Sequence, residues 1–359
     1  MLRCSHSPGQ ALPVQSQALG GLSEIRETCM NAHRDIDGVL VQWGDRLFYP
    51  GNRMLKVKVP PRLGTSLRSQ AKAIRNRIEA TVVRRSPQVM LKVTGGGRGM
   101  GGIAAHFRYI SKNGRLTIED DRGSIESGKE AVHAMLEQWR FGGSLIDENS
   151  PRREAFNLVL SMPRGTAGHG VLQAAREFAR IELKDHRYVM VLHEHQENPH
   201  VHLCVRAESM DGVRLNPRKS DLHRWRETFA ERLRGLGIDA EATRQASRGE
   251  GKCYPALWQT CAQKQGRLKK SPVPSKSGEA YRRSRVGALE AWARIGSALR
   301  LSDQATDREL AIRISNFLRE SMFGRELAMQ KDRGLRSRTP MRSLAPVDSQ
   351  AIKEVKRER

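Results

Sequence analysis

Residues 188–207 read YVMVLHEHQENPHVHLCVRA, which is two apolar runs joined by a short polar turn. Runs rich in valine and leucine predict β-strands, here over 188–195 and 200–207. The connection 196–199 is so short that the two strands must run antiparallel. Strand alternation places the histidines of each strand on one face and the valines and leucine of the second strand on the other, so this hairpin has a polar face and a core face.

The segments around this hairpin predict a mixture of strands and helices. From residue 88 the predicted order is strand, helix, helix, strand, helix, strand, strand, helix. The further strands are expected at 88–95 and 156–163, and the helices at 103–114, 128–142, 171–183 and 220–237, the last with Ser220 as its N-cap. An antiparallel pair within this order favours an α+β fold, with a central antiparallel sheet flanked by helices.

The regions on either side differ in composition, which sets the expected domains. Short strands are expected at 38–43, 46–50 and 54–59, and 66–85 is a basic helix that either faces solvent or contacts nucleic acid. Beyond residue 250 the chain becomes basic and rich in proline and serine before helical spacing returns. The expected division is an N-terminal extension 1–86 of unclear role, a central domain 87–250, a basic linker 251–278, a C-terminal helical region 279–325 and a disordered basic tail 326–359.

The charge balance indicates a polyanionic partner. The 359 residues carry a formal net charge of +24, which favours nucleic acid first and an anionic membrane second. No run approaches the roughly 18 apolar residues of a membrane span, and the N-terminus has no secretory signal, so membrane insertion is not expected. The five cysteines are scattered without a Cys-x-x-Cys pair, which argues against a disulfide framework and favours a reducing cytosol.

Four histidines fall within ten residues of the hairpin: His193, His195, His200 and His202. The turn can fold the two pairs together, and imidazoles that converge from neighbouring strands are typical of a metal site. A structural zinc site is one alternative, although only Cys204 could add a cysteine ligand. Three histidines that leave coordination positions open favour a catalytic metal.

HEHQENPHVHLCV (193–205) resembles the third motif of plasmid-mobilisation relaxases of the MobA/VirD type, which belong to the HUH endonucleases. In that family the pattern is His-x-Asp, four residues, then His-hydrophobic-His. The resemblance implies that His193, His200 and His202 bind a divalent metal ion, with Mg²⁺ or Mn²⁺ expected and Zn²⁺ as the alternative. His195 stands where the family usually has aspartate, and we expect it to act as general base or to orient the site.

Three further segments carry the resemblance through the central domain. HFRYISKNGR (106–115) resembles the first motif of the family, which implies that Tyr109 is the nucleophile. FNLVLSMPRG (156–165) resembles the second motif, which implies that Ser161 helps to hold DNA. ATRQASRG (242–249) resembles the segment that closes the domain in this subfamily.

The resemblance also implies a function for the central domain. Such relaxases nick and rejoin one DNA strand at a transfer origin, by metal-dependent tyrosine transesterification through a covalent 5′-phosphotyrosyl intermediate. The expected partners are single-stranded or supercoiled DNA at the origin, accessory relaxosome proteins and a type IV secretion coupling protein. The expected location is the bacterial cytoplasm, with translocation to a recipient cell alongside the DNA.

Basic residues near the motifs are expected to hold DNA phosphates. One group flanks the tyrosine and the other lies near the end of the domain: Arg108, Lys112 and Arg115, and Arg244 and Arg248. Two other functions stay open at this point. One is an HUH nickase of replication or transposition, and the other is a non-catalytic basic DNA-binding accessory protein whose histidines hold a structural metal.

Overall fold

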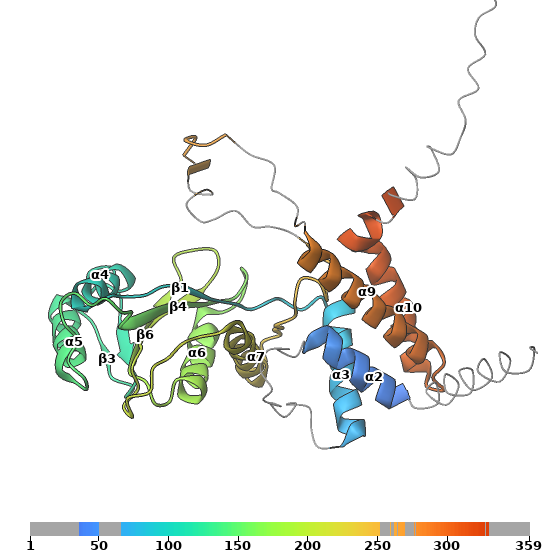
Figure 1. Cartoon of the computed structure of the whole chain (residues 1–359), viewed down its shortest axis with the longest axis horizontal. Helices are drawn as coiled ribbons and strands as arrows, with labels where there is room; N and C mark the ends of the chain where they lie inside the picture. The colour runs from blue at the N-terminus through green and yellow to red at the C-terminus, as the bar shows by residue number, and fades with distance from the viewer. Residues whose placement is uncertain are drawn as a thin grey trace, which may run out of the picture.

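The computed structural model describes residues 36–49, 66–251 and 278–326, together with a few residues between and after them (259, 262–263, 265–269, 276 and 328–329). Figure 1 shows these residues as an α/β part around a sheet and a group of helices beside it. The strand expected at 54–59 lies outside the described residues, as do most of the expected linker and most of the expected basic tail.

The centre of the α/β part is a six-stranded sheet in which all neighbouring strands are antiparallel. In order across the sheet, the strands are β1 (Met90–Gly95), β4 (Ala155–Ser161), β6 (His200–Arg206), β5 (Tyr188–His193), β2 (Ile118–Asp120) and β3 (Ile125–Glu126). The β5–β6 hairpin is therefore central, and the expected antiparallel sheet is confirmed. The short β2–β3 hairpin was not expected, because strands this short show too little alternation to be detected.

Helices cover both faces of the sheet, which confirms the expected α+β fold (Figure 1). On one face lie α4 (Met100–Ile110) and α5 (Lys129–Phe141), and on the other lie α6 (Gly168–Glu182) and α7 (Lys219–Gly235). The core under α6 and α7 includes Phe178, whose ring meets Trp225 edge to face with centroids 6.1 Å apart. Each large apolar side chain buried in such a core contributes about 1.5–3 kcal/mol, so this face provides much of the stability of the sheet.

The two faces of strand β6 serve different purposes. Val201, Leu203 and Val205 belong to the core under α6 and α7. His200 and His202 alternate with them and therefore point to the opposite face, where α4 and α5 lie. The separation of histidines from core residues that the sequence predicted is confirmed.

A helix, α2 (Ile36–Phe48), covers the segment 38–43 and residues 46–48, so the expectation of two strands there was wrong. Its buried residues have helical spacing. Residue 50 lies outside the described residues. Gly44 lies where α2 approaches α3 (Leu67–Val82). A Cβ at this position would lie 2.5 Å from a side-chain atom of α3, so the glycine permits close helix packing.

Helices from both ends of the described chain pack into one bundle (Figure 1). α2 and α3 contact each other and pack against α9 (Glu279–Arg300) and α10 (Ala305–Glu320). Trp292 lies in the bundle core, with its ring 5.9 Å from that of Phe48 and 5.7 Å from that of Phe317. The helices expected before and after the central domain therefore share one hydrophobic core.

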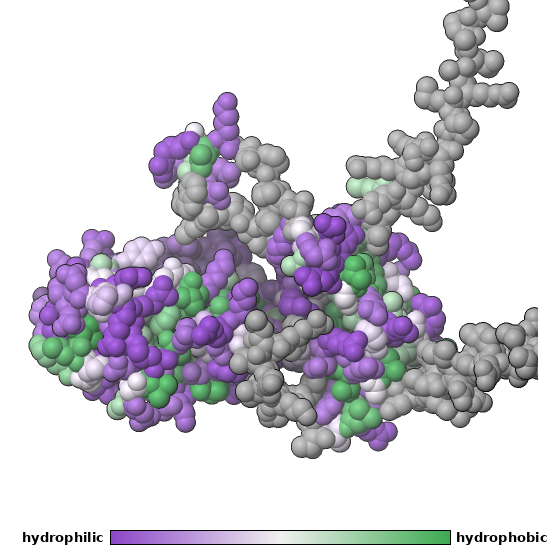
Figure 2. Space-filling model, viewed as in Figure 1, coloured by the Kyte–Doolittle hydropathy of each residue, from purple (hydrophilic) through white to green (hydrophobic). Residues whose placement is uncertain are grey.

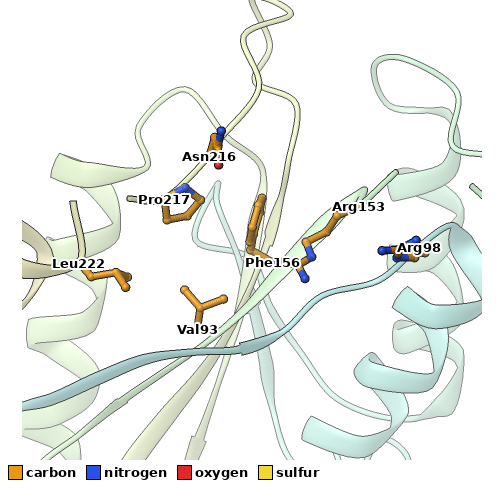
Figure 3. A pocket seen from close by; sticks show the side chains of 7 residues that line it. All are labelled: Val93, Arg98, Arg153, Phe156, Asn216, Pro217 and Leu222. Carbon is orange, nitrogen blue, oxygen red and sulfur yellow. The ribbon is translucent and has the colours of Figure 1, made fainter. Parts of the chain in front are cut away.

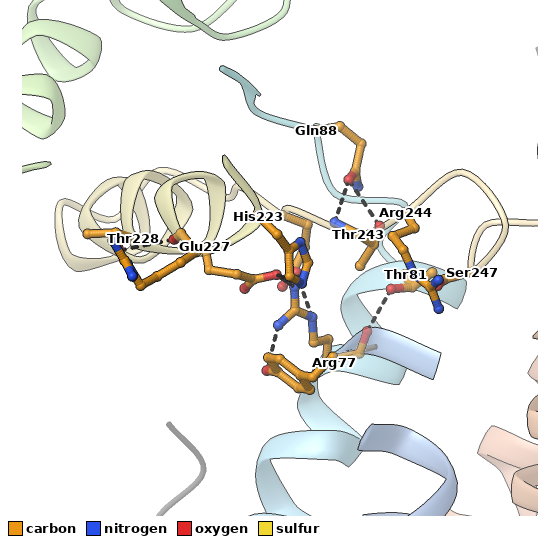
Figure 4. A network of polar contacts seen from close by, with 12 residues as sticks. Arg77, Thr81, Gln88, His223, Glu227, Thr228, Thr243, Arg244 and Ser247 are labelled. Atoms are coloured by element: carbon orange, nitrogen blue, oxygen red, sulfur yellow. Dashed lines mark hydrogen bonds and ion pairs between the residues drawn. The ribbon is translucent and has the colours of Figure 1, made fainter. Parts of the chain in front are cut away.

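Arg77 of α3 joins this bundle to the α/β part (Figure 4). Its guanidinium lies 2.6 Å from the carboxylate of Glu227 on α7 and 3.3 Å from that of Glu241, and it donates a hydrogen bond of 2.5 Å to the Tyr49 hydroxyl. Arg77 and both glutamates are buried. Burial is the largest single influence and would lower the pKa of Arg77, but Glu227, Tyr49 and Glu241 together outweigh it and the pKa is raised. The two parts are therefore joined through a buried cluster of charges.

Two helices begin at residues other than those expected. α7 has Arg218 as its N-cap, and the backbone N–H of Arg218 donates to the Asp221 carboxylate at 2.8 Å, so the prediction of Ser220 as N-cap was wrong. α4 begins at Met100, directly after the glycine-rich segment 95–99. Gly99 in that segment has φ +91°, and a Cβ there would lie 2.3 Å from a backbone oxygen of the loop that precedes β4. Only glycine therefore fits at position 99 without a change of the backbone.

The face of the molecule drawn in Figure 2 is mostly hydrophilic, with apolar side chains scattered among polar ones. Within the described part of the chain, no helix has the length and apolar character needed to cross a membrane. The hydrophilic surface agrees with the high positive charge of the sequence.

Candidate metal centre and nucleophile

Three histidines of the central hairpin meet on the sheet face that α4 and α5 cover. His193 ends β5, and in the strand register it pairs with His200, while His202 follows two residues later on β6. Each of the three offers a ligand atom within 4.8 Å of the others, and all three side chains are buried. Strand pairing therefore brings the three predicted metal ligands together.

The hydrogen bonds of these rings leave nitrogen atoms free for a metal. His193 Nε2 lies 2.7 Å from the carbonyl oxygen of Ile110. His200 Nδ1 lies 2.9 Å from the carbonyl oxygen of Asn198. These nitrogens must carry hydrogen, so His193 Nδ1 and His200 Nε2 keep their lone pairs. His202 makes no such bond through Nδ1, which is buried without a hydrogen-bond partner in the described residues, and its neutral ring keeps one lone pair in either tautomer. Three imidazoles arranged in this way fit a divalent cation.

Burial also favours the neutral form of two of these imidazoles, those of His193 and His202. Burial, and then the neighbouring His193 and His200, lower the pKa of His202 to about 3. Burial likewise lowers the pKa of His193. Because neutral imidazole is the form that binds metals, the protein environment favours the binding form of both rings at neutral pH.

Tyr109 is presented to the histidines by the last turn of α4. Its side chain is 66% exposed, and its ring meets that of His202 edge to face, with centroids 5.9 Å apart. The buried side of α4 is fixed in the core, where Phe107 packs on Trp139 with centroids 4.9 Å apart. The helix is thus anchored on one side and offers an accessible phenol beside the metal ligands on the other.

The chain turns sharply directly after this helix. Lys112 and Asn113 have φ of +51° and +56°, in the left-handed region that is costly for residues other than glycine, and Gly114 follows with φ +83°. A Cβ at Gly114 would lie 2.4 Å from the carbonyl carbon of Gly128. Residues 112–114 therefore form a tight turn, and the helix expected over 103–114 ends earlier, at Ile110.

Sequence reasoning gave no role to His106, which the structure also brings to this site. It lies one turn before Tyr109 on α4, and the two rings are stacked with centroids 6.2 Å apart and an angle of 29°. Its ring also lies 6.4 Å from that of His202. The Nε2 atom of His106 is buried without a partner in the described residues, and burial lowers its pKa to about 4. The i, i+3 spacing of His106 and Tyr109 was the only signal available in the sequence.

His195 lies just beyond the end of β5 and is exposed. Its ring neighbours are His193 at 5.0 Å and His200 at 6.5 Å. Slight desolvation and then the positive charge of Lys112 lower its pKa. The structure therefore places His195 at the rim of the triad, and its role as a base stays a prediction. Glu194 points elsewhere, because its carboxylate occupies the space that a Cβ on Gly168, at the start of α6, would need.

The residues expected to contact DNA near Tyr109 lie around the end of α4. Arg108 and Arg115 are exposed, and Lys112 is half-buried. Ser161 is buried, and its hydroxyl donates to the Pro199 carbonyl oxygen at 3.1 Å. In the strand register Ser161 lies opposite His200, so it supports the turn that leads into the metal ligands. Its role in holding DNA stays a prediction.

Arg244 and Arg248 lie elsewhere, at the junction between the α/β part and the helical bundle. Arg244 donates to backbone oxygens at the end of α2, including that of Leu47 at 3.1 Å. Arg248 donates to the side-chain oxygen of Gln88 at 3.0 Å. Both guanidinium groups thus tie segments of the protein together. Their assignment to DNA contact stays a prediction.

A hollow of about 310 Å³ lies at the opposite end of the sheet from the triad (Figure 3). Phe156, near the start of β4, forms part of its wall, whereas Ser161 at the other end of β4 pairs with His200. The guanidinium of Arg153 lies 5.1 Å from the centre of the Phe156 ring. Phe156 also belongs to the α6–α7 face. The hollow is therefore separate from the triad.

Comparison with protein families identifies the class of this site. Part of the chain is similar to relaxase nuclease domains. More particularly, residues 109–237 match the family model described as "Relaxase: MobA/VirD2-like, nuclease domain", so this part of the chain is a MobA/VirD2-like relaxase nuclease domain. The match begins at Tyr109 and includes all three histidines of the triad. The resemblance inferred from the sequence is thereby confirmed.

One solved structure that matches the chain was reported as "Molecular Basis of Vancomycin Resistance Transfer in Staphylococcus aureus". It is 13% identical in sequence, has a TM-score of 0.29, and the match covers 44% of this chain and 99% of that chain. No curated protein sequence matches this chain.

Proposed function

We propose that this protein is a relaxase that cuts one strand of plasmid or mobile-element DNA with Tyr109 as the nucleophile and later rejoins it. One observation carries the proposal: the side chain of Tyr109 is exposed, and its ring lies 5.9 Å from the ring of His202, which belongs to the buried triad. A tyrosine that served only for packing would be expected to be buried, as Phe107 on the same helix is. The family match over residues 109–237 supports DNA nicking in general.

In the proposed step, the Tyr109 Oη forms a bond to the phosphorus atom as the bond from phosphorus to the 3′ oxygen breaks. The phenolic proton passes to a neighbouring base, for which His195 is our prediction, and the departing 3′ oxygen takes up a proton to become a hydroxyl. The product carries a 5′-phosphotyrosyl link. One phosphodiester bond has replaced another, so the 3′-hydroxyl can attack this link and rejoin the strand.

The triad and the nucleophile are held together by the backbone of α4. A divalent cation bound by His193, His200 and His202 would supply positive charge to a phosphoryl oxygen as negative charge develops there. His193 donates its Nε2–H to the carbonyl oxygen of Ile110, the residue after Tyr109. This hydrogen bond fixes the end of α4 against β5, so the phenol keeps its position relative to the ligands.

Positive charge around Tyr109 supports a DNA substrate. Arg108 and Arg115 are exposed, and Lys112 lies near enough to His195 and His193 to lower their pKa values. Phosphates on either side of the cut strand would meet these three cations, and each contact would release condensed counterions.

We also propose the setting in which this cleavage takes place. The motif order that resembles mobilisation relaxases supports a transfer origin as the substrate, in single-stranded or supercoiled DNA. Accessory relaxosome proteins and a type IV coupling protein would then be partners in the bacterial cytoplasm. An HUH nickase of replication or transposition would use the same site on a different origin, so it differs from this proposal in substrate and not in chemistry.

Nicking of supercoiled plasmid tests the proposal. The full-length protein, a plasmid with a candidate origin and Mn²⁺ or Mg²⁺ should give open circles, and EDTA should prevent this. His202→Ala should slow nicking by roughly 100-fold or more, because the triad loses a ligand. His133→Ala is the matched control, since His133 is exposed on α5. Equal nicking by both variants would remove the triad from the chemistry and favour the accessory-protein function.

A further inference from the structure

We propose that His106 is the hydrogen-bond partner of the metal ligand His202, and that through this bond it positions the ligand relative to Tyr109. The inference rests on the proposed function, because it takes His202 to be a metal ligand. In this arrangement the Nδ1–H of His202 donates to Nε2 of His106, and Nε2 of His202 faces the metal. His106 is a positioning residue, since it acts through His202.

The other two ligands show what is missing at His202. A histidine that binds a metal through one ring nitrogen usually donates the other N–H to a fixed acceptor, which sets its tautomer and orientation. His193 has the carbonyl oxygen of Ile110 for this purpose, and His200 has that of Asn198. His202 Nδ1 is buried and has no such acceptor among the described residues.

His106 carries the complementary atom. Its Nε2 is also buried without a partner in the part of the chain that the structure describes. The rings of His106 and His202 meet edge to face, with centroids 6.4 Å apart and an angle of 69°. A buried polar nitrogen without a partner is unfavourable, and one hydrogen bond between these rings would satisfy both nitrogens. The bond requires the two side chains to approach each other from the positions recorded in the structure.

The same side chain reaches the nucleophile. His106 stacks on Tyr109 with centroids 6.2 Å apart, and Tyr109 meets His202 edge to face at 5.9 Å. The three rings therefore form a closed set in which each contacts the other two. Because His106 and Tyr109 lie on one turn of α4, a bond from His106 to His202 would fix that turn against β6, as the Ile110 carbonyl fixes it against β5.

Metal affinity tests this inference without recourse to nicking. The full-length protein would be titrated with Co²⁺, with binding followed by its visible absorption. His106→Phe keeps an aromatic ring but has no acceptor, and it should bind Co²⁺ roughly 10–100-fold more weakly than the wild type. His106→Gln places an amide oxygen near the position of Nε2 and should recover affinity to within a few-fold of the wild type. His133→Phe is the surface control and should bind like the wild type.

A third variant distinguishes the loss of the hydrogen bond from misfolding. His106→Asn has a shorter side chain that cannot reach the Nε2 position, so it should bind as weakly as His106→Phe while keeping a wild-type circular dichroism spectrum. Equal Co²⁺ affinity for the wild type and His106→Phe would overturn the inference and leave the metal site intact. Equal losses in the Gln and Asn variants would also overturn it, because they would indicate packing. A wild-type protein that binds no Co²⁺ would overturn the metal site of the proposed function, and this inference with it.

Discussion

Replacing Arg77 by methionine should strongly destabilise the protein, because this change leaves two buried carboxylates without their cation. Arg77 lies 2.6 Å from Glu227 and 3.3 Å from Glu241, and all three side chains are at most 9% exposed. Methionine preserves much of the apolar length of the side chain, so the main loss is the charge. The perturbation thus tests the junction between the helical bundle and the α/β part.

The expected size of the effect follows from burial. Removing one partner of a buried ion pair typically costs about 3–5 kcal/mol, since the remaining charge stays in a poorly solvated site. A surface pair gives the contrast. Arg313 and Glu309 are 3.1 Å apart on α10 with side chains 57% and 64% exposed, and breaking such a pair costs about 1 kcal/mol or less. Arg313→Met is therefore the matched control.

The loss should depend on pH in a defined direction. Burial raises the pKa of Glu241 above its usual range, even though Arg77 opposes the shift. A carboxyl group with a raised pKa in the folded state binds protons more tightly there, so its contribution to stability falls as pH rises through that pKa. Without Arg77 the pKa of Glu241 should rise further. The deficit of Arg77→Met should therefore be largest at neutral pH and should shrink as pH falls towards 5.

Urea unfolding followed by circular dichroism measures these differences. The informative third variant combines Arg77→Met with Glu227→Gln and Glu241→Gln, because neutral amides do not need a cation. It should recover at least half of the lost free energy of unfolding. A loss under about 1 kcal/mol for Arg77→Met, equal to that of Arg313→Met, would refute the claim that the junction is a buried charge cluster. So would a deficit that does not change with pH.

Three further predictions concern the turn after the tyrosine helix, the buried thiol and the DNA contacts. Gly114→Ala should reduce both stability and nicking, because φ at this position is +83° and the new Cβ would lie 2.4 Å from a backbone carbon. Thermal unfolding and nicking rates measure the two effects. Wild-type values for both would contradict the prediction. Burial raises the pKa of the Cys204 thiol, which is fully buried, so peptide mapping should find it unmodified by iodoacetamide at pH 8 until urea unfolds the protein. If Arg108, Lys112 and Arg115 each contact a phosphate of single-stranded DNA, affinity should fall about 20-fold for a fourfold rise in salt, and Arg108→Gln should reduce the slope by roughly 0.7. An unchanged slope would remove Arg108 from the interface.

The triad could be predicted from the sequence because it depends on local geometry alone. His193, His200 and His202 belong to two strands joined by a short turn, so alternation and antiparallel pairing are enough to bring them together. Tyr109 could be assigned only through its motif, since nothing local shows that α4 covers the same face of the sheet. The metal ligands thus follow from chain geometry, and the nucleophile from resemblance.

Features that depend on contacts between segments far apart in the chain could not be predicted from the sequence. α2 was mistaken for strands because GVLVQW is short and apolar, and only its packing on α3 and α9 shows why Gly44 lies in a helix. The shared core of the bundle joins segments from both ends of the described chain, which no local pattern reports. The contact of His106 with His202 likewise depends on how α4 crosses β6. Arg244 was expected to hold DNA, and no local pattern indicates that its guanidinium donates to backbone oxygens of α2.

Covalent capture of DNA tests whether Tyr109 is the nucleophile. Labelled single-stranded DNA that spans a candidate origin would be incubated with the full-length protein and Mn²⁺, the reaction would be quenched with detergent, and the linked peptide would be identified by mass spectrometry. We expect a protein–DNA adduct at Tyr109 that needs the metal and is absent from Tyr109→Phe. An adduct that persists in Tyr109→Phe, or that maps to another tyrosine such as Tyr188, would contradict it.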